Sequence, residues 1–339
     1  MNRPPSPLNM LLSRHTRRRE FIVAVGGSVA WPLTARAQQP MPVIGFMSAR
    51  SPEDSVAVLA AFRRGLGEGS LIERKNVEIQ FRWARGDLNR LPALAAELVN
   101  QRVAVLVAVG GESSALAAKA ATSTIPIVFA STDPVKAGLV ASLNRPGGNA
   151  TGVYIVTTEV EAKRLSLLRD LVPGAAMFGG LVNPTYPAAV RQAQELAEAA
   201  RKVGQSIVFA NASTDAELDA AFATLTRQRV VAMLVTGDPF FDTRRDQIIA
   251  FAAQQKLPAI YQFREYVVAG GLMSYGPNFP EAYHQVGIYA ARILSGAKPA
   301  DLPVMQSDKF EFVINLKVAK TLGVTFSGNL LSLADEVIE

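Results

Sequence analysis

From Pro42 onward, short apolar runs alternate with longer stretches in which apolar residues recur at three- and four-residue spacing. Short, nearly continuous apolar runs are typical of strands buried on both faces, and the longer spacing is typical of amphipathic helices. The first strands are predicted at Val43–Met47, Val77–Trp83, Ala104–Val109, Ile127–Ala130 and Gly152–Ile155. The helices between and after them are predicted at 53–68, 88–101, 113–121 and 136–143.

The same alternation then begins again. A second set of strands is predicted at Ala176–Val182, Ser206–Ala210, Ala232–Thr236, Ala259–Tyr261 and Gly271–Tyr275. Its helices are predicted at 158–170, 186–203, 215–228 and 240–256. Two consecutive sets of βα units predict an α/β protein with two doubly wound, parallel-sheet lobes.

The residues after Tyr275 are too few for a third domain. They predict a helix at Phe279–Ser295, a strand at Phe310–Ile314 and a final helix capped by Asn315. We expect this tail to return to the first lobe and then cross again, so that a hinge of three chain segments joins the lobes. The expected N-terminal lobe comprises residues 42–152 and 277–303, and the C-terminal lobe comprises residues 153–276 and 304–339.

Residues 1–37 have the pattern of a cleaved export signal. Arginines precede an uncharged run, Phe21–Leu33, and Ala35 and Ala37 fit a signal peptidase site. The run is shorter than the roughly 20 apolar residues of a membrane-spanning helix, so we expect no stable membrane anchor after processing. The stretch Arg18-Arg19-Glu20-Phe21-Ile22 resembles the twin-arginine (Tat) motif for export of folded proteins. An ordinary Sec signal is the alternative, and both routes predict a soluble protein in the periplasm.

The predicted signal also accounts for the net charge. The whole chain has 35 basic and 29 acidic residues and a net charge of +6. Six of the arginines and one of the acids lie within residues 1–37, so the remaining chain is nearly neutral. A basic surface for nucleic acid is therefore not expected, and we predict no nucleic-acid partner.

Cysteine is absent, and His284 is the single histidine outside the predicted signal. The sequence therefore offers no disulfide framework, thiol nucleophile or Cys-based metal site. Zinc sites and Ser-His-Asp triads draw on histidine, so the commonest metallo and hydrolytic chemistries are disfavoured. We predict no enzymatic activity, no cofactor and no metal, and a structural or surface role for His284 in its helix.

Ligands of open α/β sheets bind beyond the carboxyl ends of the strands, where helix N-termini present free backbone N–H groups. In the first lobe, Gly110-Gly111-Glu112-Ser113-Ser114 joins a strand to a helix, so its glycines allow an anion to approach and its serines can donate hydrogen bonds. Simple helix capping is the alternative reading of this stretch and of Asp133 before Pro134. The ligand-binding candidates of this lobe are Ser48, Gly111, Ser113, Ser131, Thr132 and Asp133.

In the second lobe, Thr236-Gly237-Asp238-Pro239 also follows a strand, and two phenylalanines come next. A carboxylate beside aromatic rings suits an ammonium group, although Asp238 could instead only cap a helix. Tyrosines near strand ends combine contact area with a polar tip, which suits a cleft between lobes. The candidates of this lobe are Asn183, Asp238, Phe240, Tyr261 and Tyr275.

Several stretches together carry a resemblance to a known family. They are GGLMSYG at 270–276, KPADLPV at 298–304, ASTDPVKAGLV at 130–140 and the Asn-Pro of LVNP at 181–184. With them the chain resembles the substrate-binding components of ABC importers, and more narrowly the subgroup named for tryptophan and tyrosine transport. The resemblance covers about Pro42 to Glu339 and implies a type I periplasmic binding protein fold that encloses its ligand when the lobes close.

The resemblance also implies roles for some of the candidates. If an aromatic amino acid is the ligand, Ser113 and Ser131 would bind its carboxylate, Asp238 its amine, and Phe240 or Tyr261 its ring. The implied function is capture of a small, amino-acid-like solute and its transfer to an ABC permease in the inner membrane, by a protein expected to be a monomer. A sensory module for a membrane kinase and a cofactor-dependent periplasmic enzyme remain as alternatives.

Overall fold

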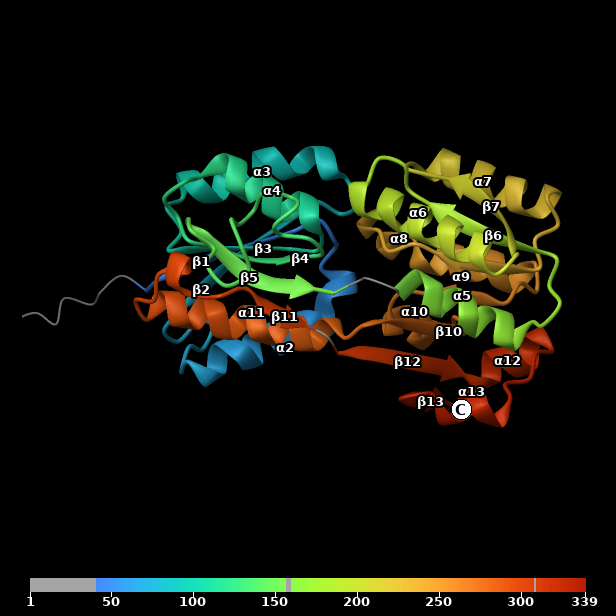
Figure 1. Cartoon of the computed structure of the whole chain (residues 1–339). Coiled ribbons are helices and arrows are strands. Elements are labelled where there is room, and N and C mark those ends of the chain that lie inside the picture. The colour runs from blue at the N-terminus through green and yellow to red at the C-terminus, as the bar shows by residue number, and fades with distance from the viewer. Residues whose placement is uncertain (1–40, 157–159, 308) are drawn as a thin grey trace, which may run out of the picture. The chain divides into compact units, whose positions relative to one another are not determined.

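The structure is a computed structural model that describes residues 41–156, 160–307 and 309–339. The predicted export signal lies outside these residues and stays a prediction. Residues 42–339 form one compact unit that contains two sheets, seen in Figure 1. Within the described ranges, no helix has both the length and the apolar content needed to cross a membrane.

The first sheet and its helices make up the N-terminal lobe. Its strands are β1 (Val43–Ser48), β2 (Glu78–Trp83), β3 (Val105–Val109), β4 (Ile127–Ser131), β5 (Ala150–Ile155) and β11 (Met305–Ser307). They lie in the order β11-β5-β4-β3-β1-β2, and the paired strands are parallel. The α-helices are α2 (Val56–Glu68), α3 (Leu91–Asn100), α4 (Glu112–Ala121) and α11 (Phe279–Leu294). Short 3-10 helices are η2 (Glu53–Ser55), η3 (Leu88–Arg90) and η4 (Pro299–Asp301).

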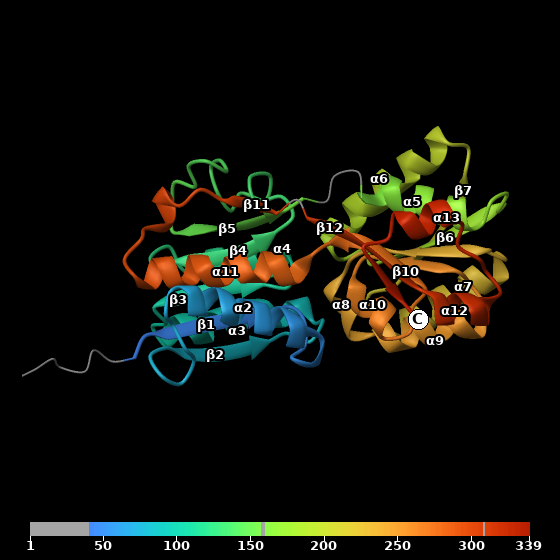
Figure 2. The ribbon, with the colours of Figure 1, turned by 90° about the horizontal axis from the view of Figure 1, so that it is seen from below.

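Burial on both faces explains why these strands are almost wholly apolar. Along β1, Ile44 and Phe46 belong to the core on the side of α2 and α11, whereas Met47 belongs to the core on the side of α3 and α4. Side chains of a strand alternate between faces, so a strand between two helical layers needs apolar residues at every position. Figure 2 shows α2 and α11 side by side on one face of this sheet.

The second sheet is the centre of the C-terminal lobe. Its strands are β6 (Met177–Val182), β7 (Ser206–Asn211), β8 (Ala232–Val235), β9 (Ala259–Tyr261), β10 (Met273–Pro277), β12 (Phe310–Asn315) and β13 (Glu336–Ile338). Their order is β13-β12-β10-β9-β8-β6-β7, and β12 pairs with β10 in antiparallel fashion. One helical layer contains α7 (Asp215–Arg227), α8 (Pro239–Thr243), α9 (Arg245–Gln254) and α10 (Arg264–Val268). The other contains α5 (Val160–Leu171), α6 (Pro187–Lys202), α12 (Leu316–Leu322) and α13 (Gly328–Ser332).

The chain passes between the two sheets three times: after β5, between β10 and α11, and between β11 and β12. The predicted fold class, two doubly wound lobes joined by a three-segment hinge, is confirmed. Two lobe boundaries differ from the expected ones by a few residues. Strand β5 continues its pairing with β4 as far as Tyr154, and the short strand β11 joins the first sheet by pairing with β5.

Two helix predictions were wrong. The predicted helix at 136–143 is a series of turns, because the chain reverses at Gly138 (φ 71°) and the N–H of Leu139 donates to the carbonyl of Pro134. The predicted helix at 240–256 is two helices, since the N–H of Arg244 donates to the carbonyl of Phe241 and closes α8. Strands β11 and β13 and helix α10 were not predicted. The predicted N-cap is confirmed, because the Oδ1 atom of Asn315 accepts from the N–H of Val318 at 3.0 Å.

Candidate ligand-binding site

A cavity lies between the carboxyl ends of the two sheets. Its volume is about 50 Å³, several times the ~10–15 Å³ that one water molecule needs on the same measure. The N-terminal lobe lines it with Arg50, Gly110, Gly111, Glu112, Ala130, Ser131, Thr132, Ile155, Phe279 and Tyr283. The C-terminal lobe lines it with Tyr186, Ala188, Gln192, Gly237, Asp238, Pro239, Asp242, Gln262, Phe263 and Pro277.

The N-terminus of α4 opens onto this cavity through two glycines. Gly110 (φ 78°) and Gly111 (φ 131°) adopt backbone conformations that other residues rarely adopt, and Gly111, at the N-cap position, has no side chain that could cap the helix. The first N–H groups of a helix have no partner within the helix, so this end can accept an anion. A β-carbon at Gly110 would lie 2.3 Å from Ser48 Oγ, which shows how closely the β1 and β3 loops pack.

The acidic side chain of Glu112, in the first turn of α4, is engaged by neighbours. Its Oε2 atom accepts from Arg191 Nη2 at 2.8 Å and from Thr132 Oγ1 at 3.5 Å. Arg191 belongs to α6, so this ion pair joins the two lobes. The carboxylate of Glu112 is therefore neutralised beside the helix N-terminus instead of standing free there.

Ser131 ends β4 and is buried beside the same helix N-terminus. Its Oγ atom has no hydrogen-bond partner among the described residues and lines the cavity. A buried hydroxyl without a partner costs free energy, so it indicates a group that is satisfied by something other than the protein.

On the opposite lobe, Asp238 caps α8 and also faces the cavity. Its Oδ1 atom accepts from the N–H groups of Phe240 and Phe241 at 2.8 and 3.1 Å, and its Oδ2 atom accepts from Asn183 Nδ2 at 3.0 Å. Burial raises the pKa of Asp238 to about 6, against the opposing effect of these hydrogen bonds. A carboxylate offers about four acceptor positions, so one remains for a ligand.

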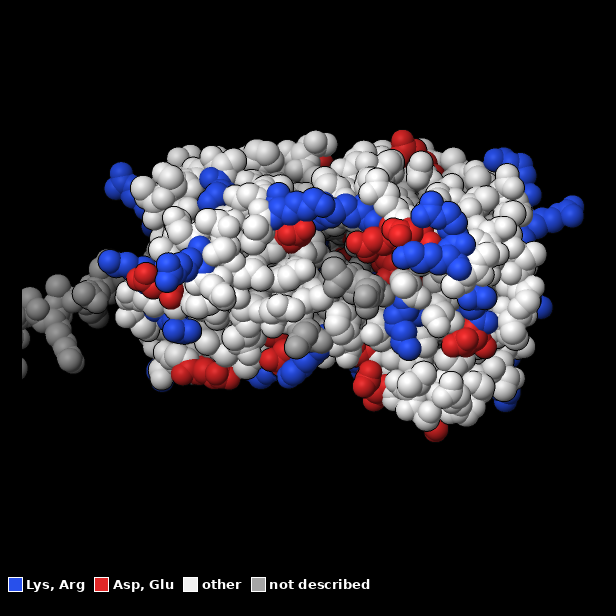
Figure 3. All heavy atoms as spheres, in the orientation of Figure 1, with Lys and Arg blue, Asp and Glu red and all other residues white. Residues whose placement is uncertain are grey.

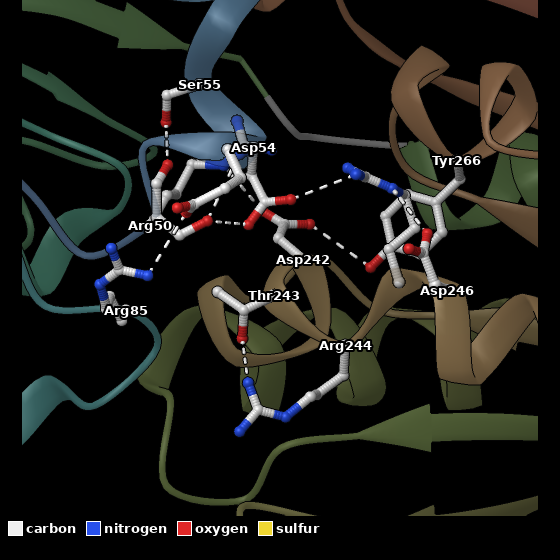
Figure 4. A network of polar contacts seen from close by, with 12 residues as sticks. Arg50, Asp54, Ser55, Arg85, Asp242, Thr243, Arg244, Asp246 and Tyr266 are labelled. Carbon is white, nitrogen blue, oxygen red and sulfur yellow. Dashed lines mark hydrogen bonds and ion pairs between the residues drawn. The ribbon is translucent and has the colours of Figure 1, made fainter.

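Arg50, in the loop after β1, meets Asp242 of α8 inside the cavity, as Figure 4 shows. Both side chains are buried, and Arg50 Nε lies 3.2 Å from Asp242 Oδ2. The N–H does not point at this oxygen, so within the described residues neither Nε nor Nη2 of Arg50 has a hydrogen-bond partner. Burial raises the pKa of Asp242 to about 7 despite the attraction of Arg50. Burial would lower the pKa of Arg50, but Asp242 and other nearby acids outweigh this effect and raise it.

The aromatic side chains that reach the cavity are not those predicted. Phe263 and Phe279 each hold their ring centre 5.7 Å from Arg50 Cζ, and Tyr186 and Tyr283 complete the aromatic wall. The predicted rings pack elsewhere. Tyr261 is fully buried and stacks on Tyr266, Tyr275 stacks on Phe310, and Phe240 packs between Phe241 and Arg244.

Of the predicted site residues, the cavity lining contains Gly111, Ser131, Thr132 and Asp238. Ser48 and Asn183 lie just behind it, where Ser48 Oγ accepts from the N–H of Arg50 and Asn183 holds Asp238. Asp133 lines an adjoining cavity of about 100 Å³, and Ser113 is half-buried outside the lining of the first cavity. None of these placements tests ligand contact, so the roles stay predictions. His284 pairs with Glu68 on the surface between α11 and α2, away from the cavity.

The residues that the sequence reasoning missed arise in two ways. Four of them closely follow strands, where ligands of α/β sheets bind, so the sequence could have indicated them: Arg50, Tyr186, Gln262 and Phe263. Phe279 follows β10 by two residues, so the same reasoning could have included it. Tyr283 lies further along α11 and Asp242 lies within α8, so only the folded chain brings these two to the cavity.

Ion pairs join the lobes around the cavity as well as within it. Arg245 Nη2 of α9 lies 3.2 Å from Asp54 Oδ1 of η2, in addition to the Arg191–Glu112 and Arg50–Asp242 pairs. Figure 3 shows basic and acidic side chains gathered where the two lobes meet. Three ion pairs therefore join the lobes in the arrangement that encloses the cavity.

Comparison with known proteins extends over nearly all of the described chain. A family model described as ABC transporter substrate binding protein matches residues 51–338. A tyrosine-binding protein of Clostridioides difficile is 29% identical over 264 residues, which cover 77% of this chain and 75% of that protein. The architecture of two parallel-dominated sheets is that of type I periplasmic binding proteins.

Two solved structures differ in how well they superimpose. The ABC domain from Streptococcus pneumonia in complex with L-Trp is 26% identical with a TM-score of 0.80, over 88% of this chain and 99% of that one. The ligand-free, open structure of a substrate binding protein with adhesive properties from Clostridium difficile has the same identity and coverage, but a TM-score of 0.63. The present arrangement of lobes thus resembles that of the L-Trp complex more than that of the open structure.

Proposed function

Because this chain belongs to the ABC transporter substrate binding protein family, we propose that it captures an amino-acid-like solute between its lobes and delivers it to an inner-membrane permease. One observation is the main support for an amino acid as the ligand. The helix N-terminus at Gly111 and the Oγ atom of Ser131, which has no partner among the described residues, face a buried carboxylate, Asp238, across the cavity. This pairing matches the carboxylate and the ammonium of an amino acid.

The carboxylate end of the ligand is assigned to the N-terminal lobe. The backbone N–H groups after Gly111 and the Ser131 hydroxyl supply donors to an anion, and Arg191 neutralises the nearby Glu112. The ammonium end is assigned to Asp238, which keeps one acceptor position. The aromatic wall of Phe263, Phe279 and Tyr186 supports a ring-bearing side chain. The tyrosine-binding relative and the L-Trp complex support the same ligand class.

The cellular setting belongs to the same proposal. We propose export by the twin-arginine route, removal of residues 1–37, and action as a monomeric receptor in the periplasm without a membrane anchor. Transport is preferred over sensing because the matching family is described by its ABC transporters. The mature protein is proposed to bind its solute without catalysis or a cofactor.

The ligand class is tested by thermal unfolding of residues 38–339 in the presence of a solute library. We expect L-amino acids, and aromatic ones most strongly, to raise the melting temperature, because a ligand that binds only the folded state stabilises it. Stabilisation by neutral sugars alone would refute the amino-acid assignment.

Ser131→Ala is expected to weaken binding of the stabilising amino acid by about 10- to 100-fold, the loss of one hydrogen bond to a charged group. The folded protein should not lose stability, because the Oγ atom has no hydrogen-bond partner among the described residues. Ser114→Ala is the matched control, since Ser114 Oγ is also buried and unpartnered but lies outside the cavity lining. Isothermal titration calorimetry of both variants measures the difference, and equal affinities would remove Ser131 from the site.

Affinity for the amino acid is expected to rise about tenfold between pH 5 and pH 8. The pKa of Asp238 is raised to about 6, so at pH 5 its carboxyl is mostly protonated and cannot pair with an ammonium group. Above that pKa the charged form dominates, and binding no longer requires loss of a proton. Calorimetric titrations across this range should show the rise, and Asp238→Asn should flatten it. A native profile that falls with pH would place the ammonium elsewhere.

A further inference from the structure

Arg50 is a buried cation, and two of its three guanidinium nitrogens have no hydrogen-bond partner within the described residues. Its side chain is 3% exposed and lines the cavity, and within the described residues its Nε and Nη2 atoms have no hydrogen-bond partner. Leaving buried donors unpaired is costly, more so on a charged group. In the proposed binding mode, Asp238 binds the ammonium group of the amino acid and the α4 N-terminus binds its carboxylate. Arg50 is therefore free to bind a different part of the ligand.

The charge around Arg50 limits what that part can be. Asp242 balances the guanidinium at 3.2 Å, and Asp54 and Glu265 add further negative potential. A second carboxylate on the ligand would be repelled by these acids. A purely apolar group would leave the Arg50 donors unpaired. A neutral hydroxyl satisfies both groups, because it can accept from Arg50 and donate to a carboxylate oxygen of Asp242.

The strand order gives the backbone separation between the end of β4, at Ser131, and the end of β1, before Arg50. Ser131 ends β4 and Arg50 follows β1, and β3 lies between these strands in the sheet. Two strand spacings amount to roughly 9–10 Å, which is about the reach of an amino acid that carries a six-membered ring. Phe263 and Phe279 flank Arg50 and supply apolar walls for such a ring.

We propose that Arg50 and Asp242 form a subsite for a hydroxyl group at the far end of the ligand's side chain, which makes Arg50 a specificity-determining residue. The chain would then select amino acids with a hydroxylated ring over those with a plain ring. This inference rests on the proposed amino-acid function and adds the side-chain end group to it.

The test compares L-tyrosine with L-phenylalanine, which differ only in the hydroxyl, by calorimetry on the mature protein. We expect the native protein to bind L-tyrosine at least about tenfold more tightly, since a site built for a hydroxyl discriminates strongly against its absence. Arg50→Met should reduce this ratio to less than about threefold, mainly by weakening L-tyrosine, because one hydrogen bond to a charged group is lost. Arg50→Lys keeps the charge without the fork of donors and should give an intermediate ratio.

Arg245→Met is the matched control. It also removes an arginine that pairs across the lobes, with Asp54, but Arg245 does not line the cavity. It should weaken both amino acids by the same factor and leave the ratio unchanged. Cooperative unfolding without ligand shows that each variant is folded. If Arg50→Met does not fold, the reduced ratio of Arg50→Lys tests the subsite instead.

Three outcomes would overturn the inference. Equal affinity of the native protein for both amino acids refutes the subsite and leaves the proposed function standing. An unchanged ratio in Arg50→Met assigns the discrimination to other residues. If neither amino acid binds, the subsite is refuted, and the solute library then decides whether the proposed amino-acid function falls as well.

Discussion

Replacing Arg164 by methionine is expected to lower the free energy of unfolding by about 3–5 kcal/mol. Arg164 of α5 is fully buried, and its Nη1 atom donates to Glu161 Oε1 at 2.7 Å. Burial raises the pKa of Glu161 and lowers that of Arg164, although the two groups attract each other. Removing the cation therefore leaves a buried carboxyl without its partner, and it leaves the carbonyl of Tyr275 without the donor Nε at 2.7 Å.

Two further variants separate this effect from the loss of any ion pair. Glu161→Leu combined with Arg164→Met should recover most of the stability, because an apolar pair often replaces a buried ion pair without loss. Lys202→Met breaks the exposed pair with Glu198 and should leave the free energy of unfolding almost unchanged, because solvent screens exposed ion pairs. Urea unfolding of the three proteins provides the free energies. An Arg164→Met cost as small as that of Lys202→Met would contradict the prediction.

Arg164 lies close to two of the three segments that join the lobes. Helix α5 is the first element of the C-terminal lobe after the chain leaves β5, and β10 is the last strand before the chain returns through α11. By bonding the carbonyl of Tyr275 in β10, Arg164 ties the elements that adjoin two of the three crossings. This hydrogen bond therefore holds together α5 and β10, the two elements of the C-terminal lobe next to these hinge segments.

The fold could be predicted from the sequence because local patterns determine its units. A strand that is apolar at every position, such as Val105–Val109, can bury both of its faces only between two layers of helices. The alternation of such strands with amphipathic stretches predicts parallel βα units. The errors fall where a local pattern competes with a local interruption. At 136–143 the apolar spacing suits a helix, but the turn at Gly138 ends it after one turn.

The candidate site was only partly predictable, since it depends on which strands are neighbours. Gly111, Ser131 and Asp238 follow strands, and the strand-end rule places such residues at one edge of a sheet. The meeting of Arg50 with Asp242 requires the two lobes to face each other, which no local pattern encodes. Asp238 both caps α8 and lines the cavity, so its role as a cap leaves the predicted contact with a ligand open.

Gly65→Ala is expected to destabilise the protein by about 3 kcal/mol or more, the upper range for overpacking. Helices α2 and α11 pack backbone against backbone at this point. A β-carbon at Gly65 would lie 2.0 Å from the carbonyl oxygen of His284, and one at Gly287 would lie 2.2 Å from that of Phe62. Main-chain atoms of two helices cannot yield as the end of a flexible side chain can, so the helices must separate.

Gly67→Ala, two residues along α2, is the matched control with the opposite expected sign. No atom of the described residues lies within 4 Å of a β-carbon at this position, so the substitution should stabilise the protein by about 0.5–1 kcal/mol through helix propensity. Because α11 also carries Phe279 and Tyr283 into the cavity, Gly65→Ala should weaken ligand binding and Gly67→Ala should not. Thermal melts and calorimetry of both variants measure these effects. Equal changes in the two proteins would mean that the packing of α11 on α2 does not set the position of the cavity wall.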